Sequence, residues 1–484
     1  MSFCRRPHAR QTLRSRFGPG GEAPPAADGI EEFERIHHTK ELKRMSAKAD
    51  GFINFLEKHL TPIATRIENQ RHIATIKDGM ISLMAILMVG SISLIIAGVG
   101  NFFPEGSPVH EFFTRHSALL NLPFNFTFGL LAIYSAVSIS YTHARRLDLP
   151  PLHAIIGGVL ATVILCGRYE DGKFDFAFLD SRGLFVSIFA SMFAVEAMKW
   201  LVEKKITIRI KGLPDMIGKT FEAILPLLVI IIASMIINQT VISLSGGQIL
   251  PEVFTTMFAP AVKGIDSYLG VFLVSLFEMM FWFLGLNGYA ILVGFTLPFM
   301  THYLAENAAA FSAGEVPQYI FTENWWGYFL ACTGSGLTGA LAILALFSKS
   351  KTLRATGKAT IIPAFFNISE PVVYGFPVVY NPYLFLPFVI GTPLLGMFTY
   401  FIFDMGWVRA PIASVGGMPT PIAQYLVTLD WKAVLLVPVI LGLAILMYYP
   451  FFKIYEKSVL KKEELETRAQ SKEGDVLKDL DLDF

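Results

Sequence analysis

The chain has 484 residues, of which 53% are hydrophobic and 16% are charged, and its formal net charge at neutral pH is +1. Soluble domains carry roughly a quarter of charged residues, so this composition excludes an ordinary soluble protein and indicates a polytopic membrane protein of the all-α class. The near-zero net charge predicts no nucleic-acid partner. The three cysteines lack metal-type spacing, so no metal and no cofactor is expected.

The N-terminal 44 residues differ from the rest of the chain. They are polar and rich in Arg, Pro and Gly, and they contain no apolar run that could serve as a signal peptide. Such a composition predicts a disordered extension. An alternative is that translation begins at Met45, and the sequence alone does not decide between the two.

Apolar runs long enough to cross about 30 Å of hydrocarbon predict about ten transmembrane helices. The runs begin near residues 80, 124, 150, 184, 219, 268, 286, 326, 383 and 431.

Basic residues in the short loops predict the orientation. Lys and Arg follow the second, fourth and eighth runs, whereas residues 303–325 contain neither. Because cytoplasmic loops are enriched in Lys and Arg, both termini are predicted to be cytoplasmic. The orientation of the chain in the membrane accounts for most of these Lys and Arg residues. The alternative is that they dock an acidic or phosphorylated partner. Residues 349–358 and the C-terminal lysines are both predicted to be cytoplasmic. Residues 360–382 must therefore enter and leave the membrane on that side, as a re-entrant hairpin.

The stretch FFNISEPVVYGFPVVYNP, residues 365–382, contains the groups most able to bind a substrate. Pro371 and Gly375 break helices, and broken helices present polar groups near the middle of transporters. Asn367 and Glu370 are three residues apart and would share one helical face. A carboxylate inside a membrane is costly, so Glu370 is a candidate functional residue, against the alternative of a structural acid satisfied by a neighbour.

The segment NISEPVVYGFPVVYNP resembles the signature of the membrane (IIC) subunit of sugar phosphotransferase systems, in the lactose, cellobiose and diacetylchitobiose branch. Residues 55–80 are similar to the amphipathic entry helix of that branch, and FWFLGLNG, residues 281–288, to its Trp-Phe-Phe-Gly-Ile-His-Gly element. The resemblance extends from about Met45 to Lys461. Two positions depart from it: Asn287 replaces a His, and MPTP at 418–421 replaces Trp-Thr-Thr-Pro.

The resemblance implies a homodimeric permease in the bacterial plasma membrane, in contact with membrane lipid. Residues 45–245 would form the dimer scaffold, residues 246–460 the sugar-binding half, and residues 461–484 a charged tail. The substrate would be a β-linked disaccharide or β-glucoside, phosphorylated on its 6-hydroxyl. The tail is too short for a globular phosphate-carrying domain, so the donor would be a separate phosphorylated IIB subunit. The chain would be the membrane component of a protein-phosphocysteine-sugar phosphotransferase.

The expected sugar contacts are Glu370, Asn367, Asn287 and Trp282. Glu370 is also the expected catalytic group, as a base for the sugar hydroxyl, although positioning alone is an alternative in a loose transition state. Glu278 is expected to be structural. The sequence GSGLTG at 334–339 is interpreted as helix packing rather than a nucleotide loop.

Two other functions fit the same residues. One is a proton-coupled sugar symporter in which Glu370 carries the proton. The other is a membrane sensor that binds sugar without moving it.

Overall fold

A computed structural model describes residue 55 and residues 58–170, 173–210, 214–376 and 378–479. The chain divides into two units, Met1–Lys58 and His59–Phe484. The predicted disordered extension, residues 1–44, lies outside the described residues. Everything that follows concerns the second unit.

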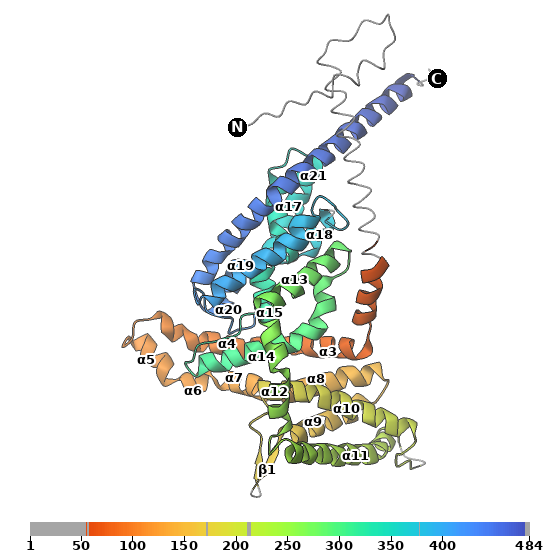
Figure 1. The fold of residues 1–484 in the computed structure, drawn as a ribbon, viewed down its shortest axis with the longest axis vertical. Helices are drawn as coiled ribbons and strands as arrows, with labels where there is room; N and C mark the ends of the chain where they lie inside the picture. Colours follow the sequence, from red (N-terminus) through yellow and green to blue (C-terminus); the bar gives the residue numbers. More distant parts are fainter. Residues whose placement is uncertain (1–54, 56–57, 171–172, 211–213, 377, 480–484) are drawn as a thin grey trace, which may run out of the picture. The chain divides into compact units, whose positions relative to one another are not determined.

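The described part of that unit is almost entirely helical (Figure 1). A helix over residues 58–68 comes before α3. In the scaffold region the elements are α3 (Arg71–Ser82), α4 (Met84–Gly98), η1 (Val99–Phe102), α5 (Pro108–Arg115), α6 (Ser117–Leu120), α7 (Leu122–Thr127), η2 (Phe128–Leu130), α8 (Leu131–Arg146), α9 (Pro151–Cys166), β1 (Arg168–Glu170), β2 (Lys173–Asp175), η3 (Ser181–Gly183), α10 (Leu184–Glu203) and α11 (Asp215–Leu244).

The remaining elements, where η marks a short 3-10 or π-helical turn, are α12 (Leu250–Ile265), α13 (Tyr268–Phe283), α14 (Gly288–Ser312), α15 (Glu323–Trp325), η4 (Trp326–Leu330), η5 (Ser335–Leu337), α16 (Gly339–Leu346), α17 (Lys351–Phe365), α18 (Glu370–Gly375), η6 (Leu386–Gly391), α19 (Thr392–Asp404), α20 (Thr420–Thr428) and α21 (Lys432–Asp479). The two strands have three residues each and form one antiparallel pair. All other described elements are helical, so the all-α class expected from the sequence is confirmed.

Long apolar helices match the expected membrane spans. Within the described residues, seven helices are long and apolar enough to cross a membrane, and the number rises to nine if two bent pairs each count as one span. The bends are 69° between α12 and α13 and 50° between Glu323–Leu337 and α16. The run near residue 150 forms α9, a 16-residue helix. The predicted count of ten is therefore not confirmed, because α9 is short for a full crossing.

The scaffold helices share a core with a helix from the second half. Side chains of α3, α4, α8 and α10 pack with those of α14 in one cluster, which includes Met80, Leu87, Ile139, Ile188 and Leu297. A second cluster joins α8, α9, α10 and α11, which lie together in Figure 1. The scaffold and the second half are thus in direct apolar contact, and their division near residue 245 stays a prediction.

The segment GSGLTG forms a break in a span. Gly334 and Gly336 have φ values of +109° and +76°, a left-handed region that glycine adopts without strain. The backbone of Gly336 also lies against the Phe388 ring, where a Cβ atom would clash. The sequence-based expectation of close packing accounts for Gly336, but it missed that the helix itself is interrupted here.

Replacing Gly336 by alanine tests this break. The added methyl group meets both a strained φ and the Phe388 ring, so the substitution should destabilise the protein by about 2 kcal/mol or more. Thermal unfolding in detergent measures the effect. Gly442→Ala is the matched control, because α21 leaves open space around Gly442 and alanine favours a helix. Equal melting temperatures for the two variants would contradict the account.

Candidate functional site

One pocket collects the residues that the sequence predicted for sugar binding. Its volume is about 280 Å³, near the lower end of the range of about 300–1,000 Å³ that is usual for small-ligand sites. The lining residues are Met84, Glu278, Trp282, Asn287, Tyr289, Glu323, Asn324, Trp326, Gly327, Tyr328, Ala331, Ser335, Asn367, Ser369, Glu370, Val415 and Gly416. They come from α4, α13, the start of α14, the broken span 323–337, the hairpin loop and the segment before α20. All four predicted contacts thus line a single pocket.

Glu370 is the first residue of α18 and is followed by Pro371, which suits the first turn of a helix because it needs no N–H partner there. Its side chain is exposed and makes no hydrogen bond or ion pair with any other described residue. The carboxylate is therefore available to a ligand. A free acceptor at the pocket wall suits the hydroxyl groups of a sugar.

Asn367 connects the hairpin loop to the broken span. Its Oδ1 accepts a hydrogen bond from the N–H of Gly334 at 2.7 Å, and its Nδ2 donates to the carbonyl of Gly327 at 2.6 Å. Its own φ of +64° lies in the left-handed region that Asn tolerates. Both ends of the amide are thus engaged with the backbone, which leaves one N–H and one lone pair for a ligand.

Ser369 adds a second connection between the same two segments. Its Oγ accepts from the N–H of Ser335 at 2.7 Å, and Ser335 in turn donates its hydroxyl to Glu278 at 3.0 Å. The other oxygen of Glu278 accepts from Trp326 Nε1 at 2.5 Å. Glu278 is 1% exposed, so this carboxylate is buried at the pocket wall with two donors and no cation among the described residues.

Two buried polar atoms at the pocket wall lack a partner. Trp282 Nε1 has no acceptor in hydrogen-bonding geometry, and Asn324 Oδ1 has no donor, within the part of the chain that is described. The Nδ2 of Asn324 donates to the carbonyl of Val415 at 2.8 Å, which fixes the direction of the amide. A buried polar atom without a partner is costly, so both atoms are candidates for contact with a polar ligand.

Asn287 caps a helix and also lines the pocket. It is the N-cap of α14, where its Oδ1 accepts from the N–H of Ala290 at 2.9 Å. Asn is among the best N-cap residues. Two residues later, the hydroxyl of Tyr289 donates to Glu323 at 3.0 Å, so a third carboxylate joins the pocket.

Sequence reasoning missed several of these wall residues. Glu278 was expected to be structural, and it does support the pocket wall, but it also faces the pocket. Glu323 and Asn324 lie in residues 303–325, which the sequence marked only by the absence of Lys and Arg. The π-helical turn η4, which carries Trp326 and Gly327, has no sequence signature either, although such turns are frequent at functional sites.

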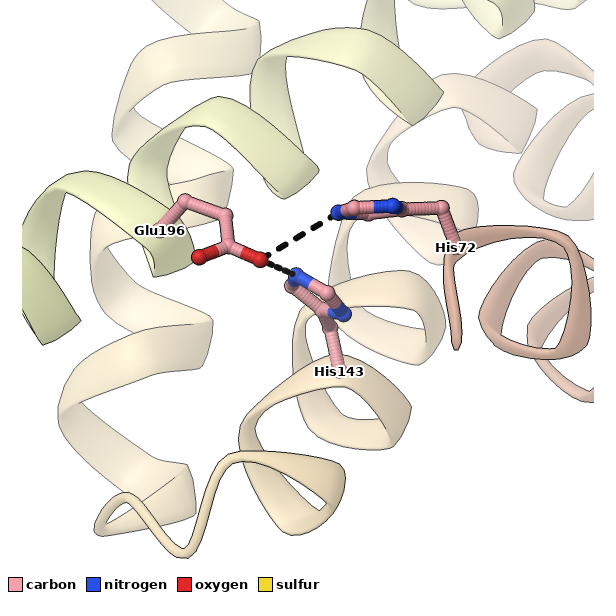
Figure 2. A group of neighbouring side chains, drawn as sticks. All are labelled: His72, His143 and Glu196. Atoms are coloured by element: carbon pink, nitrogen blue, oxygen red, sulfur yellow. Dashed lines mark hydrogen bonds and ion pairs between the residues drawn. The ribbon is translucent and has the colours of Figure 1, made fainter. Parts of the chain in front are cut away.

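A second cluster of ligating side chains lies in the scaffold. Figure 2 shows His72 of α3 and His143 of α8 both pointing at Glu196 of α10. Their Nε2 atoms lie 3.3 and 2.9 Å from the same Glu196 oxygen. Arg71 reaches that oxygen too, at 3.0 Å.

Hydrogen bonds around this cluster oppose a metal site. Gln70 Oε1 accepts from the N–H of Ile73 at 2.7 Å, so its Nε2 faces His72 Nδ1 at 3.0 Å. The proton of His72 then sits on Nε2, which a metal would need unprotonated. With Arg71 on the same carboxylate, the cluster is an ion-paired junction of α3, α8 and α10.

The long apolar helices, the bent spans and the polar pocket between them define an integral membrane transporter. A family model described as "Phosphotransferase system, EIIC" matches residues 77–392. The chain belongs to this family. It is thus a multi-pass plasma-membrane protein, and IIC components of this system transport sugar together with IIB components.

Curated relatives align over most of the chain. The putative permease IIC component YwbA of Bacillus subtilis is 30% identical, over 85% of this chain and 97% of the relative. The lichenan permease IIC component of the same organism is also 30% identical, over 84% and 94%. The lactose-specific EIICB component of Lacticaseibacillus casei is 26% identical, over 86% of this chain and 73% of the relative.

A solved structure has the same fold. It is the crystal structure of the transporter ChbC, the IIC component from the N,N'-diacetylchitobiose-specific phosphotransferase system. The two chains are 26% identical and superpose with a TM-score of 0.76, over 85% of this chain and 99% of that one. The predicted family and branch are therefore confirmed, whereas the roles of individual site residues stay predictions.

The substitution Asn367→Asp tests the connection between hairpin and broken span. It keeps an acceptor for Gly334, but it places a carboxylate oxygen against the Gly327 carbonyl in place of the N–H donor. The loss should lower both thermal stability and sugar affinity, the latter about ten- to hundredfold. Calorimetric titration with the transported sugar and thermal unfolding measure the two effects.

Asn287→Asp is the matched control, because it adds the same charge to the same pocket while keeping an equally good N-cap. It should leave the melting temperature unchanged. An Asn367→Asp variant as stable as the unsubstituted protein would show that the bridge contributes nothing.

Proposed function

We propose that this chain is the membrane permease of a phosphotransferase system for a β-linked disaccharide or β-glucoside. The observation that carries the proposal is the shared pocket of Glu370, Asn367, Asn287 and Trp282. The relatives named for lichenan, lactose and diacetylchitobiose support the substrate class.

The pocket composition suits a carbohydrate. Carboxylates and amides supply hydrogen-bond acceptors and donors for hydroxyl groups, and aromatic rings supply apolar faces. The aromatic residues that line the pocket are Trp282, Tyr289, Trp326 and Tyr328. Glu370 and Asn324 Oδ1 provide acceptors with no protein partner in the described chain, and Trp282 Nε1 provides a donor.

The reaction we propose is transfer of a phosphoryl group to the sugar. The oxygen of the 6-hydroxyl forms a bond to phosphorus as the sulfur–phosphorus bond of a cysteine on the IIB protein breaks. The hydroxyl proton passes to Glu370, and the thiolate stays on IIB. In this scheme the chain supplies position and an acceptor for the proton, which are the main needs of phosphoryl transfer.

The assembly and orientation belong to the same proposal. Both termini would lie in the cytoplasm, since the basic loops predict it. A homodimer would form through the scaffold half, residues 45–245. The exposed apolar side chains of α11, among them Ile224, Ile232 and Ile236, provide a surface for a second copy or for lipid.

Transport in vesicles tests the function. Vesicles that contain the purified chain should accumulate sugar 6-phosphate only when a phosphorylated IIB protein is supplied on the cytoplasmic face. A panel of β-linked disaccharides and β-glucosides identifies the substrate. Accumulation of free sugar driven by a pH gradient would instead establish a symporter, and saturable binding without uptake would establish a sensor.

The role of Glu370 is tested by Glu370→Gln. The amide keeps the size of the side chain but cannot take a proton, so the turnover of phosphorylation should fall by about 10²- to 10⁴-fold. Sugar affinity should fall much less, because the amide oxygen still accepts hydrogen bonds. Steady-state phosphorylation and equilibrium sugar binding, measured on the same preparation, separate the two effects.

Glu315→Gln is the control, since Glu315 is an exposed carboxylate outside the sugar pocket. It should change neither measurement. Equal losses of phosphorylation and binding in Glu370→Gln would assign Glu370 a binding role alone.

A further inference from the structure

Helix α17 presents two contrasting faces. Its buried residues recur every three or four positions and so lie on one side of the helix: Leu353, Gly357, Thr360 and Ala364. At Gly357 this side meets the backbone of α16, where a Cβ atom would lie 2.9 Å from the carbonyl oxygen of Ala342. The opposite side carries an exposed stripe with spacings of three, four, four and three: Lys351, Arg354, Lys358, Ile362 and Phe365.

The first part of the stripe is positively charged without compensation. Lys351 and Lys358, with the neighbouring exposed Lys349, form no ion pair among the described residues. The nearby carboxylates of Glu456 and Glu463 bind groups other than these lysine ammonium groups, and Glu456 also pairs with Lys453. Glu456 accepts from the N–H of Lys349 at 2.7 Å, and Glu463 accepts from the N–H of Thr352 at 3.0 Å.

These two carboxylates also fix the helix in place. Glu456 and Glu463 are two turns apart on α21, and they also accept from the hydroxyls of Ser348 at 2.6 Å and Ser350 at 2.7 Å. The start of α17 is thereby attached to α21 at two points. The lysines consequently project from a rigid element rather than from a free loop.

The last part of the stripe is apolar and leads to the sugar pocket. Ile362 is 68% exposed and Phe365 is 46% exposed, and both border an apolar hollow of about 270 Å³. After Phe365 the chain turns directly into Asn367 and Glu370. Since a helix rises 1.5 Å per residue, Lys358 lies only about 10 Å along the axis from this end.

We propose that this stripe is the docking surface for the phosphorylated IIB protein. The inference rests on the proposed function, because it names where the phosphate donor of that reaction binds. A phosphoryl group carries about −1.5 to −2 charges, and a fixed basic surface accelerates encounter with such a partner. The stripe ends at the pocket, where the donor cysteine must arrive.

Charge reversal on the stripe is the test. The variant Lys349→Glu/Lys351→Glu/Lys358→Glu leaves Arg354, which donates to the Ser348 carbonyl, unchanged. Glu at the first position of α17 suits the helix dipole, so the fold should tolerate it. The assay follows sugar phosphorylation against the concentration of a phosphorylated IIB protein that supports turnover by the unsubstituted chain. The KM for that protein should rise at least tenfold, with little change in kcat.

A control with equal charge separates docking from general electrostatics. Lys204→Glu/Lys205→Glu/Lys219→Glu reverses three exposed lysines, two in the loop between α10 and α11 and one near the start of α11. All three are predicted to face the same side of the membrane. It should leave the KM for IIB near that of the unsubstituted chain. Added salt should raise the KM of the unsubstituted chain and of this control, but not that of the stripe variant.

Sugar binding without IIB should be equal in all three proteins, which verifies folding. The conservative variant Lys349→Arg/Lys351→Arg/Lys358→Arg should retain the original KM. An unchanged KM in the stripe variant, or an equal rise in the control, overturns the docking surface. So does a rise in KM that appears only when the protein is reconstituted in membranes with anionic phospholipid, which would assign the lysines to lipid headgroups. An unsubstituted chain that phosphorylates no sugar would instead refute the proposed function.

Discussion

Peptide groups released by a helix break must find partners inside the protein, because the membrane interior offers no water. Here two N–H groups in the break at residues 331–338 bond to side chains of the hairpin loop. Asn367 bridges the N–H of Gly334 and the carbonyl of Gly327, and Ser369 accepts from the N–H of Ser335. Two interruptions that are separate in the sequence therefore form one hydrogen-bonded unit. The remainder of the pocket is arranged around this unit.

This unit extends to a buried carboxylate and holds an open one. Ser335 and Trp326 donate to Glu278, so α13 is coupled to the same network. Glu370 follows Ser369 directly and has no partner in the described chain. The same bonds that satisfy the break thus position a free acceptor at the pocket wall. Asn367 and Ser369 are therefore as necessary to the pocket as Glu370 itself.

The sequence predicted the pocket only in part, for identifiable reasons. Prolines and Gly375 mark the hairpin because they act locally on the backbone, and α17 does end at Phe365. The second break has no proline, and its glycines also fit helix packing, so local reasoning could not separate the two. Glu323 and Asn324 reach the pocket through tertiary folding, which no short pattern encodes. At the bend between α12 and α13, Asp266 likewise accepts from the N–H groups of Ile320 and Phe321, far along the chain.

The basic stripe of α17 connects this pocket to the surface where a phosphate donor would bind. The start of α17 is attached to α21, and the loop that follows the helix is attached to the broken span. A cryo-electron microscopy structure with the transported sugar bound would show whether the bonded hairpin and broken span hold the sugar. We expect a sugar hydroxyl within hydrogen-bonding distance of Glu370, with Asn367 still bonded to Gly334. A sugar bound elsewhere, or an intact pocket in which Asn367 has left Gly334, would contradict it.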